Sequence, residues 1–295
     1  MTTPIESEAP NPWPVRVVSD LAEMAAESKQ ARAKGQTVVL VPTMGALHAG
    51  HVALLEEGRK RGDLLVLSIF VNPTQFAPNE DLDKYPRTLH EDLTKAAAAG
   101  VDLAFVPTAA TMYPPGFQTF VEVRELQKGL CGDKRPGHFV GVATVVAKFF
   151  HIVRPEVAIF GEKDFQQLAV IRRMTADMNL GIEIVGLPTV RESDGLAMSS
   201  RNTYLSPADR TRALGLSRGL NAAKAAAAAG EKRGSVLLER AAALINPAVD
   251  RLDYLQLCDA TSLEPIESLE PNRPAVMLVA AFVGPTRLID NIQLP

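Results

Sequence analysis

Short apolar runs alternate with helical patterns along the first two-thirds of the chain. Nearly continuous apolar runs are typical of strands buried on both faces, and strand and helix in alternation predict a parallel sheet wound with helices on both faces. The predicted strands are "TVVLVP" (37–42), "DLLVLSIFVN" (63–72), "VDLAFVP" (101–107), the first part of "EVAIFGEKD" (156–164) and "IEIVGLP" (182–188). The predicted helices are residues 51–62, a segment within 85–100 that ends at Gly100, residues 140–153 and residues 165–180.

The pattern changes after about residue 190. Ser206 is a suitable N-cap for a helix with Pro207 at its first position, and an alanine-rich segment continues that helix to Gly230. Three later runs, "LDYLQLCDA", "PAVMLVAAFVG" and "TRLIDNI", predict a small antiparallel sheet. We therefore expect an α/β fold, a Rossmann-like doubly wound parallel sheet in residues 1–188, with a second, smaller α+β domain in residues 189–295.

Three predicted strands end in loops whose polar residues are suited to ligand binding or catalysis. Ligands of doubly wound sheets bind beyond the carboxyl ends of the strands. The stretches "PTMGALHAGH" (42–51), "FVNPTQF" (70–76) and "FGEKD" (160–164) follow such ends, so they are candidate loops at one edge of the sheet.

Composition narrows the class of protein. The chain has 295 residues, 46% of them hydrophobic and 22% charged, as in ordinary globular proteins. A net charge of −3 does not favour nucleic acid or anionic lipid as a partner, and no apolar run is long enough to predict a membrane span. Cys131 and Cys258 are too few for a disulfide framework, which indicates a reducing cytosol. The acidic, proline-rich start is not typical of a signal peptide, and we expect residues 1–14 to be a flexible tail.

The stretch "PTMGALHAGH" admits several interpretations. His48 and His51 lie three apart without the intervening Glu of a zinc-protease helix, so metal ligation by them is disfavoured. Gly45 and Gly50 have P-loop spacing, but His51 and Val52 stand where a P-loop has lysine and a hydroxyl residue. A chance pair of histidines at an exposed helix start stays open. The position after a parallel strand favours a phosphate site, because a helix N-terminus offers free N–H groups and imidazoles donate hydrogen bonds.

This stretch resembles the "HIGH" signature shared by class I aminoacyl-tRNA synthetases and nucleotidylyltransferases. The longer string is similar to that of the pantothenate synthetase (pantoate–β-alanine ligase) family. The matches continue, in family order, through "SIFVNPTQF" (68–76), "DLDKYPRT" (81–88), "RPGHFVGVATVVAKFF" (135–150), "IFGEKDFQQL" (159–168) and "VRESDGLAMSSRNTYLS" (190–206). The remaining C-terminal residues match more loosely, chiefly in "TRLIDNI" (286–292).

The resemblance implies an ATP-dependent ligase that condenses pantoate with β-alanine through pantoyl adenylate, releasing AMP and pyrophosphate. ATP with Mg2+ would be the co-substrate, and no tightly bound organic cofactor is implied. The resemblance also implies a cytoplasmic homodimer whose smaller domain, residues 189–295, acts as a lid over the ATP- and pantoate-binding domain.

For ATP, the resemblance singles out residues from three stretches. His48, His51 and Lys163 suit the phosphates as hydrogen-bond donors and a point charge. Asp164 suits the ribose hydroxyls. "MSSRN" resembles the "KMSKS" loop of the superfamily and supplies Ser199, Ser200 and Arg201, with Arg201 carrying the charge. The other ATP-binding candidates are Met44, Gly161, Val190 and Met198.

For pantoate, β-alanine and magnesium, the resemblance also assigns individual residues. Gln75 and Gln167 match the amide pair that holds pantoate, and Pro42, Met44, Phe70 and Val142 would form the apolar wall. Asn72 and Tyr85 are candidates near β-alanine, and Glu91 and Asp92 are candidate magnesium ligands, although neighbouring acids on a helix often face solvent. Arg135 and His138 lie in a matching stretch without an assignable role.

Two other functions stay open. A nucleotidyl transferase acting on a phosphate-bearing acceptor shares the first signature, but the amides Gln75 and Gln167 beside apolar residues suit a small hydroxy acid better. A non-catalytic nucleotide- or RNA-binding module would be expected to lack some phosphate-facing residues, and no basic patch interleaved with aromatic residues supports RNA binding.

Overall fold

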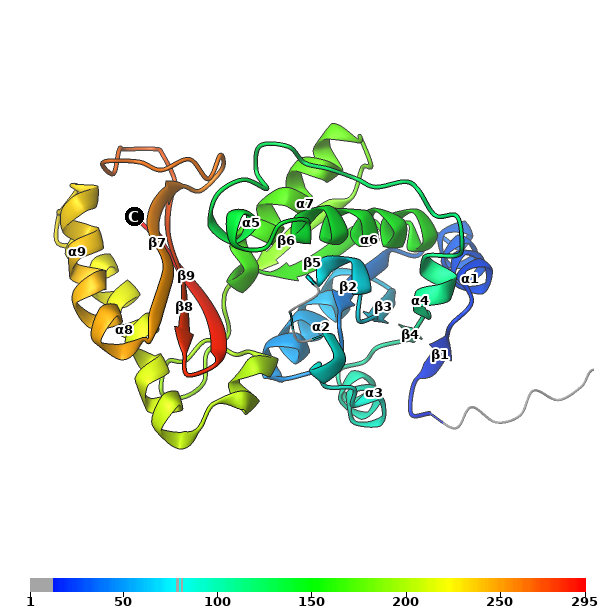
Figure 1. The fold of residues 1–295 in the computed structure, drawn as a ribbon. Coiled ribbons are helices and arrows are strands. Elements are labelled where there is room, and N and C mark those ends of the chain that lie inside the picture. The colour runs from blue at the N-terminus through cyan, green and yellow to red at the C-terminus, as the bar shows by residue number, and fades with distance from the viewer. Residues whose placement is uncertain (1–12, 78–79, 81) are drawn as a thin grey trace, which may run out of the picture.

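The computed structural model describes residues 13–77, 80 and 82–295 (Figure 1). Its strands are β1 (Arg16–Val18), β2 (Val38–Thr43), β3 (Leu64–Ile69), β4 (Leu103–Phe105), β5 (Val157–Gly161), β6 (Glu183–Leu187), β7 (Arg251–Asp259), β8 (Ala275–Val283) and β9 (Thr286–Leu294). Its α-helices are α1 (Leu21–Ala33), α2 (Ala49–Arg61), α3 (Leu89–Ala98), α4 (Ala109–Met112), α5 (Leu130–Lys134), α6 (His138–Val153), α7 (Phe165–Asp177), α8 (Pro207–Ala228) and α9 (Gly234–Ile245). Short 3-10 turns are η1 (Pro73–Gln75), η2 (Leu82–Lys84), η3 (Glu162–Asp164), η4 (Ser200–Tyr204) and η5 (Asn246–Ala248).

Six strands form a parallel sheet in the order β1-β4-β3-β2-β5-β6. From β2 the chain continues to β3 on one side, and β5 lies on the other side, which makes the β2–β5 junction the point where the strand order reverses. Such a reversal is the hallmark of a doubly wound sheet. The predicted α/β, Rossmann-like class is confirmed, and the five strands predicted between residues 37 and 188 correspond to β2 to β6.

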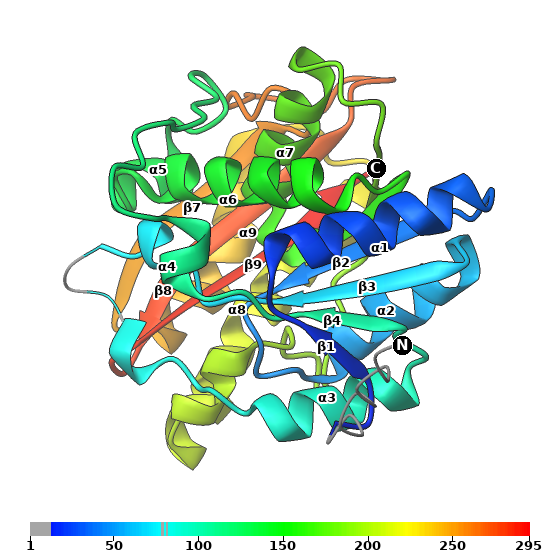
Figure 2. The ribbon, with the colours of Figure 1, turned by 90° about the vertical axis from the view of Figure 1, so that its right-hand side faces the viewer.

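Helices cover both faces of this sheet (Figure 2). Strand side chains alternate between faces. In β2, Val38 and Leu40 pack in the cluster that contains residues of α1, α6 and α7. Val39 and Val41 pack in the cluster on the opposite face with residues of α2 and α3. Burial on both faces explains why the strands are apolar at nearly every position.

The C-terminal residues form a separate antiparallel sheet in the order β7-β8-β9, with α8 and α9 on its outer face (Figure 1). Ser206 caps α8 by accepting a hydrogen bond from Asp209 N, and Pro207 is the first helical residue, as predicted. The inner face contacts the larger part of the molecule, because Val276 and Leu278 cluster with Phe165 of α7. The predicted boundary at residue 188 lies one position after β6 and stays a prediction.

The N-terminal segment differs from the predicted one. Residues 1–12 of the predicted tail lie outside the described residues. Trp13 packs against the core cluster of α2 and α3, with its ring centroid 6.1 Å from that of His90, so residue 13 is not part of a free tail. Strand β1 and helix α1 lie outside the predicted elements. Among the described residues, no helix combines the length and apolar character needed to cross a membrane.

Candidate active site

Two loops converge where the strand order reverses. One follows β2 and leads into α2; the other follows β5 and leads through η3 into α7. The paired positions of β2 and β5 are Val39–Val157 and Leu40–Ala158, so registered pairing stops before the carboxyl ends of both strands. Ligands of doubly wound sheets bind in the crevice at such a point. The first loop contains His48, and the second contains Lys163.

Glycines shape the first loop. Gly45 has φ of 84°, and Ala46 has φ of 51°, so the chain makes two consecutive left-handed residues after β2. A Cβ atom at Gly45 would lie 3.1 Å from both the Asp92 carboxylate and Ile69. A Cβ atom at Gly50 would lie 2.9 Å from the ring of His48. Both glycines are therefore required by close packing, one in the turn and one beneath the imidazole.

The two histidines form a stacked pair at the N-terminus of α2. Their ring centroids lie 4.0 Å apart at an interplanar angle of 24°. His48 Nδ1 accepts a hydrogen bond from Gly50 N at 3.1 Å, and His51 Nδ1 accepts one from His48 N at 3.3 Å. A backbone N–H is a donor, so each neutral imidazole carries its proton on Nε2. Both Nε2–H groups are thereby donors for a ligand.

These imidazoles are held in the neutral form. Burial, and then the Lys163 ammonium, lower the pKa of His48 to about 4. Burial, then His48 and Lys163, lower the pKa of His51 to about 3. At neutral pH the pair therefore offers two uncharged donors next to a lysine, which is suited to phosphate oxygens.

Helix α3 supports the loop through Asp92 and Lys95. Asp92 Oδ2 accepts from Ala46 N at 2.9 Å, and Asp92 Oδ1 accepts from Leu47 N at 2.7 Å. Lys95 Nζ donates to Leu47 O at 2.7 Å. Sequence reasoning missed this role, because no local pattern relates α3 to the loop.

The same contacts correct the expectation that Glu91 and Asp92 bind magnesium together. Asp92 is buried and both of its carboxylate oxygens are hydrogen-bonded to the backbone, whereas Glu91 is exposed on α3. Adjacent helical positions point in different directions, so the two carboxylates do not converge. Among residues 13–77, 80 and 82–295, no group of three or more His, Cys, Asp or Glu side chains has metal-binding geometry. Glu91 and Asp92 therefore do not form a shared magnesium site in this structure.

Lys163 and Asp164 extend from η3 into the crevice. Lys163 Nζ donates to Asp164 Oδ2 at 3.1 Å. Burial opposes ionisation of Asp164, but Lys163 and then Arg201 outweigh it, so its pKa lies below the usual range. Asp164 occupies the N-cap position of α7 without a side-chain capping bond, because its carboxylate is turned to the lysine. Gly161 ends β5 just before this pair.

A hairpin brings the ends of the 190–198 segment together. Met198 N donates to Val190 O at 3.0 Å, and Gly195 makes the turn with φ of 95°. A Cβ atom at Gly50 would lie 3.6 Å from Met198 Cβ, so this hairpin lies against the start of α2. The predicted adenine neighbours Val190 and Met198 are therefore side by side and next to the histidine loop.

The polar loop after the hairpin continues along the crevice. Ser199 caps η4 by accepting from Arg201 N at 3.2 Å. Ser200 Oγ lies 3.4 Å from Tyr85 Oη, which connects this loop to η2. Ser199 and Arg201 line a cavity between the larger part of the molecule and the C-terminal sheet.

The amide expected to hold pantoate is oriented by the protein. Gln75 Oε1 accepts from Asn72 Nδ2 at 3.1 Å, and Gln75 Nε2 donates at 3.1 Å to Met44 Sδ, a weak acceptor. Asn72 also donates to Gly141 O at 3.1 Å and accepts from Tyr113 Oη at 2.8 Å. Asn72 is 1% exposed, so it lies behind Gln75 and orients it. Its predicted place near β-alanine stays a prediction.

Arg135 and His138 acquire a role in the structure. His138 Nδ1 lies 2.9 Å from Gln75 O, and its Nε2 lies 2.9 Å from an Arg135 guanidinium nitrogen. Guanidinium groups only donate, so His138 accepts at Nε2 and donates Nδ1–H to Gln75 O. Burial, and then Arg135, lower the pKa of His138 to about 4. Arg135 is held in turn by a bidentate pair with Glu80, at 2.6 and 2.8 Å.

Two of the predicted wall residues are buried in the core. Phe70 and Val142 are 6% and 2% exposed and belong to the cluster of α1, α6 and α7. Pro42 is partly buried in β2. Of the two glutamines in "FQQL", Gln166 is buried and bonded to backbone carbonyls and Cys131 N, whereas Gln167 lines the cavity.

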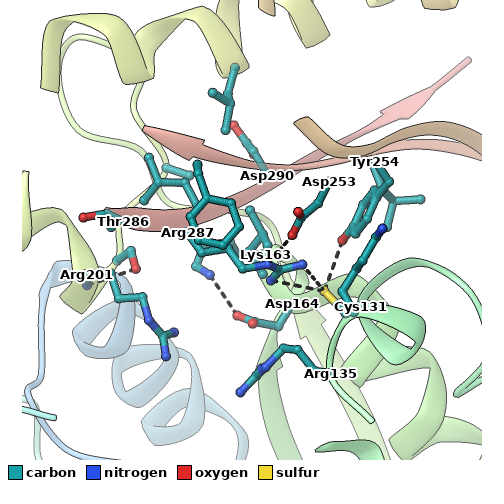
Figure 3. Close-up of a pocket in the computed structure, with 18 of the residues that line it drawn as sticks. Cys131, Arg135, Lys163, Asp164, Arg201, Asp253, Tyr254, Thr286, Arg287 and Asp290 are labelled. Carbon is teal, nitrogen blue, oxygen red and sulfur yellow. Dashed lines mark hydrogen bonds and ion pairs between the residues drawn. The ribbon is translucent and has the colours of Figure 1, made fainter. Parts of the chain in front are cut away.

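A cavity of about 920 Å³ lies between the two parts of the molecule (Figure 3). Predicted site residues on its wall are Lys163, Asp164, Gln167, Ser199 and Arg201. His48, His51 and Gln75 are not part of this wall, but Gln75 O contacts the ring of His138, which is. Its volume is within the range of small-molecule sites.

The opposite wall of the cavity contains a polar cluster that sequence reasoning did not identify. Arg287 of β9 donates to Asp253 at 2.8 Å and points toward Cys131, with guanidinium nitrogens 3.7 and 3.8 Å from Sγ (Figure 3). Tyr254 Oη lies 3.1 Å from the same sulfur. Burial raises the pKa of Tyr254, so the phenol stays protonated beside the sulfur. The cluster joins α5 to the C-terminal sheet.

The chain is similar to known proteins over nearly its whole length. The family model described as pantoate-beta-alanine ligase matches residues 16–293. A pantothenate synthetase of Syntrophotalea carbinolica is 54% identical, with 93% of this chain and 97% of that protein covered. One of Myxococcus xanthus is 53% identical, with 96% of each covered.

Solved structures agree with these matches. A pantothenate synthetase from Thermus thermophilus superimposes with a TM-score of 0.89 at 44% identity, over 95% of this chain and 100% of that one. A pantoate-beta-alanine ligase from Francisella tularensis, described as complexed with beta-gamma ATP and beta-alanine, superimposes with a TM-score of 0.78 at 32% identity, over 94% of this chain and 97% of that one.

Proposed function

The chain belongs to the pantoate–β-alanine ligase family, and from this we propose that it condenses pantoate with β-alanine to pantothenate at the expense of ATP. We propose that the reaction passes through pantoyl adenylate and releases pyrophosphate and AMP. The proposal rests on one arrangement: two neutral imidazoles with Nε2–H donors at the start of α2, electrostatically coupled to Lys163, where the strand order reverses.

In the first step, a pantoate carboxylate oxygen attacks the α-phosphorus of ATP. The bond from that phosphorus to the bridging oxygen of the leaving pyrophosphate breaks. Charge grows on the phosphate oxygens, and His48 and His51 donate hydrogen bonds to them without a change of protonation. Lys163 adds a positive charge between the phosphate and the incoming carboxylate. Arg201 is a second cation for the phosphates, on the cavity wall.

In the second step, the amine of β-alanine attacks the acyl carbon of pantoyl adenylate. The acyl–oxygen bond to AMP breaks, and the amide nitrogen loses a proton. Gln75, oriented by Asn72 and by the His138 contact to its carbonyl, would hold pantoate in place through both steps. The Francisella tularensis structure, described as holding beta-gamma ATP and beta-alanine, supports these two ligands for the shared fold.

Other features stay proposals. Asp164 would bind the ribose hydroxyls, and Val190 and Met198 would border the adenine. The C-terminal part, residues 189–295, would act as a lid, because its β9 faces the cavity across from Lys163. Magnesium would reach the site bound to ATP phosphates and not on Glu91 and Asp92. The homodimer and the cytoplasmic location follow from the resemblance, and sedimentation over a concentration series tests the first.

Pantoate-dependent exchange of pyrophosphate into ATP tests the proposed function. The exchange requires the adenylate and needs no β-alanine. Absence of exchange with purified protein would refute the ligase function, and pyrophosphate release with a phosphorylated acceptor but none with pantoate would identify a nucleotidyl transferase instead.

Site variants test the assignment of donors. His48→Ala, His51→Ala and Lys163→Ala should each lower the exchange rate about a hundredfold, as for loss of one preorganised donor. His90→Ala is the matched control, because His90 is exposed on α3. Near-normal rates in all three site variants would contradict the assignment while leaving the ligase function intact.

A further inference from the structure

Strand β9 reaches across the cavity to the loop that carries Lys163. Asn291 Nδ2 donates to Glu162 O at 2.8 Å and to Lys163 O at 2.9 Å. Asn291 is 6% exposed. Because both neighbours are carbonyl oxygens, the amide nitrogen and not the amide oxygen faces them. Two donors of one planar group thus fix two consecutive carbonyls of η3.

The preceding residue of β9 holds a second segment of the site. Asp290 receives a bidentate pair from Arg191, at 2.8 and 2.9 Å, and Asp290 is 4% exposed. Arg191 follows Val190 directly, at the start of the hairpin. Two successive side chains of the "TRLIDNI" stretch therefore hold the segments that lead to Lys163 and to the proposed adenine site. Asn291 does so through backbone carbonyls and Asp290 through the Arg191 side chain.

We propose that Asn291 is a positioning residue for Lys163. By holding the backbone of Lys163, this side chain from the C-terminal part of the chain determines where the lysine amine lies. A lysine has a flexible four-carbon stem, so the place of its amine depends strongly on where its backbone is anchored. The contact lies at the lysine itself and at Glu162 just before it. The inference rests on the proposed function, in which Lys163 acts on the phosphate and the carboxylate.

A purely structural role makes a different prediction. If Asn291 merely joins the two parts of the molecule, its loss lowers stability and affects ATP binding and turnover together. If it positions Lys163, its loss lowers the maximal rate of adenylation, because the amine is misplaced in the transition state, and leaves the KM for ATP nearly unchanged. The division between kcat and KM separates the two roles.

The experiment uses the full chain and pantoate-dependent pyrophosphate exchange at saturating substrates. Asn291→Ala removes both donors, and Asn291→Asp keeps the shape but sets a carboxylate against two carbonyl oxygens. Each should lower the maximal exchange rate about tenfold to a hundredfold, with less than a threefold change in the KM for ATP. Gln293→Ala is the matched control: it is exposed on the same strand and bonds to the Glu162 side chain, not to the loop backbone. Its rate should stay within about twofold of the wild type.

A double substitution tests whether the effect acts through the lysine. In a Lys163→Ala background, adding Asn291→Ala should change the residual rate by less than about twofold, since the positioned group is already absent. Wild-type maximal rates in both Asn291 variants, or losses that multiply in the double variant, would overturn the positioning role. An inactive wild-type protein would instead refute the proposed function, so the two failures are distinguishable.

Discussion

Asp92 offers a sharp test of how the phosphate loop is built. Its carboxylate accepts hydrogen bonds from Ala46 N and Leu47 N, where the chain leaves a left-handed conformation. Asp92→Asn keeps the volume but leaves one oxygen acceptor and turns an NH2 group toward a backbone N–H. Hydrogen bonds to charged groups contribute roughly 1.5–3 kcal/mol, and an unsatisfied buried donor costs a similar amount. We expect the free energy of unfolding to fall by about 2–3 kcal/mol.

Glu91→Gln is the matched control for this change. Glu91 and Asp92 both lie in the first turn of α3, so each substitution removes one negative charge near the helix N-terminus. Glu91 is exposed, so its loss should cost no more than about 1 kcal/mol. A fall of 2–3 kcal/mol corresponds to roughly 4–12 °C in Tm, which thermal unfolding resolves easily. The difference between the two variants isolates the contacts to the loop.

Pyrophosphate exchange at varied Mg2+ concentration completes the test. If Asp92 shapes the loop, Asp92→Asn lowers the maximal exchange rate about tenfold to a hundredfold by displacing His48, and half-saturation by Mg2+ is unchanged in both variants. If the two acids bind magnesium, both variants need more Mg2+. An Asp92→Asn protein with the wild-type Tm and a raised Mg2+ requirement would refute our account of the loop.

Three further predictions concern the same site. Because the pKa values of His48 and His51 are lowered from 6.5 to about 4 and 3, both imidazoles stay neutral as the pH falls from 8 to 5. The kcat/KM for ATP, measured by exchange, should therefore show no acid limb near pH 6.5, and such a limb in wild type but not in His48→Ala would contradict the neutral donors. Gly50→Ala should lower exchange at least about tenfold by displacing the His48 ring, although alanine favours a helix by about 1 kcal/mol; normal activity would exclude the tight contact. Gly141→Ala places a Cβ atom 2.4 Å from Thr74 O and should lower the free energy of unfolding by about 1–3 kcal/mol. Urea unfolding measures this as a lower midpoint, and an unchanged midpoint would show that α6 is not packed this closely against η1.

The sequence by itself determined the features that depend on near neighbours. Apolar runs and helical spacing predicted the strands β2 to β6 and the helices α2, α3, α6 and α7, since burial on one or both faces leaves a period in the sequence. Ser206 was recognisable as an N-cap because capping joins residues three apart. Motif resemblance selected the two histidines, Lys163 and Gln75, because these side chains were matched within short continuous stretches.

The tertiary structure alone decided what each polar group faces. Asp92 resembles any helix-surface acid in the sequence, yet its partner Leu47 lies 45 positions away. Asn72 was grouped with ligand-binding residues, but the packing of α6 turns it to Gly141 O and to Gln75. Asn291 reaches Lys163 O across 128 positions. A carboxylate or amide has the same local pattern whether it meets solvent, substrate or backbone, and only the folding of distant segments onto one another selects its partner.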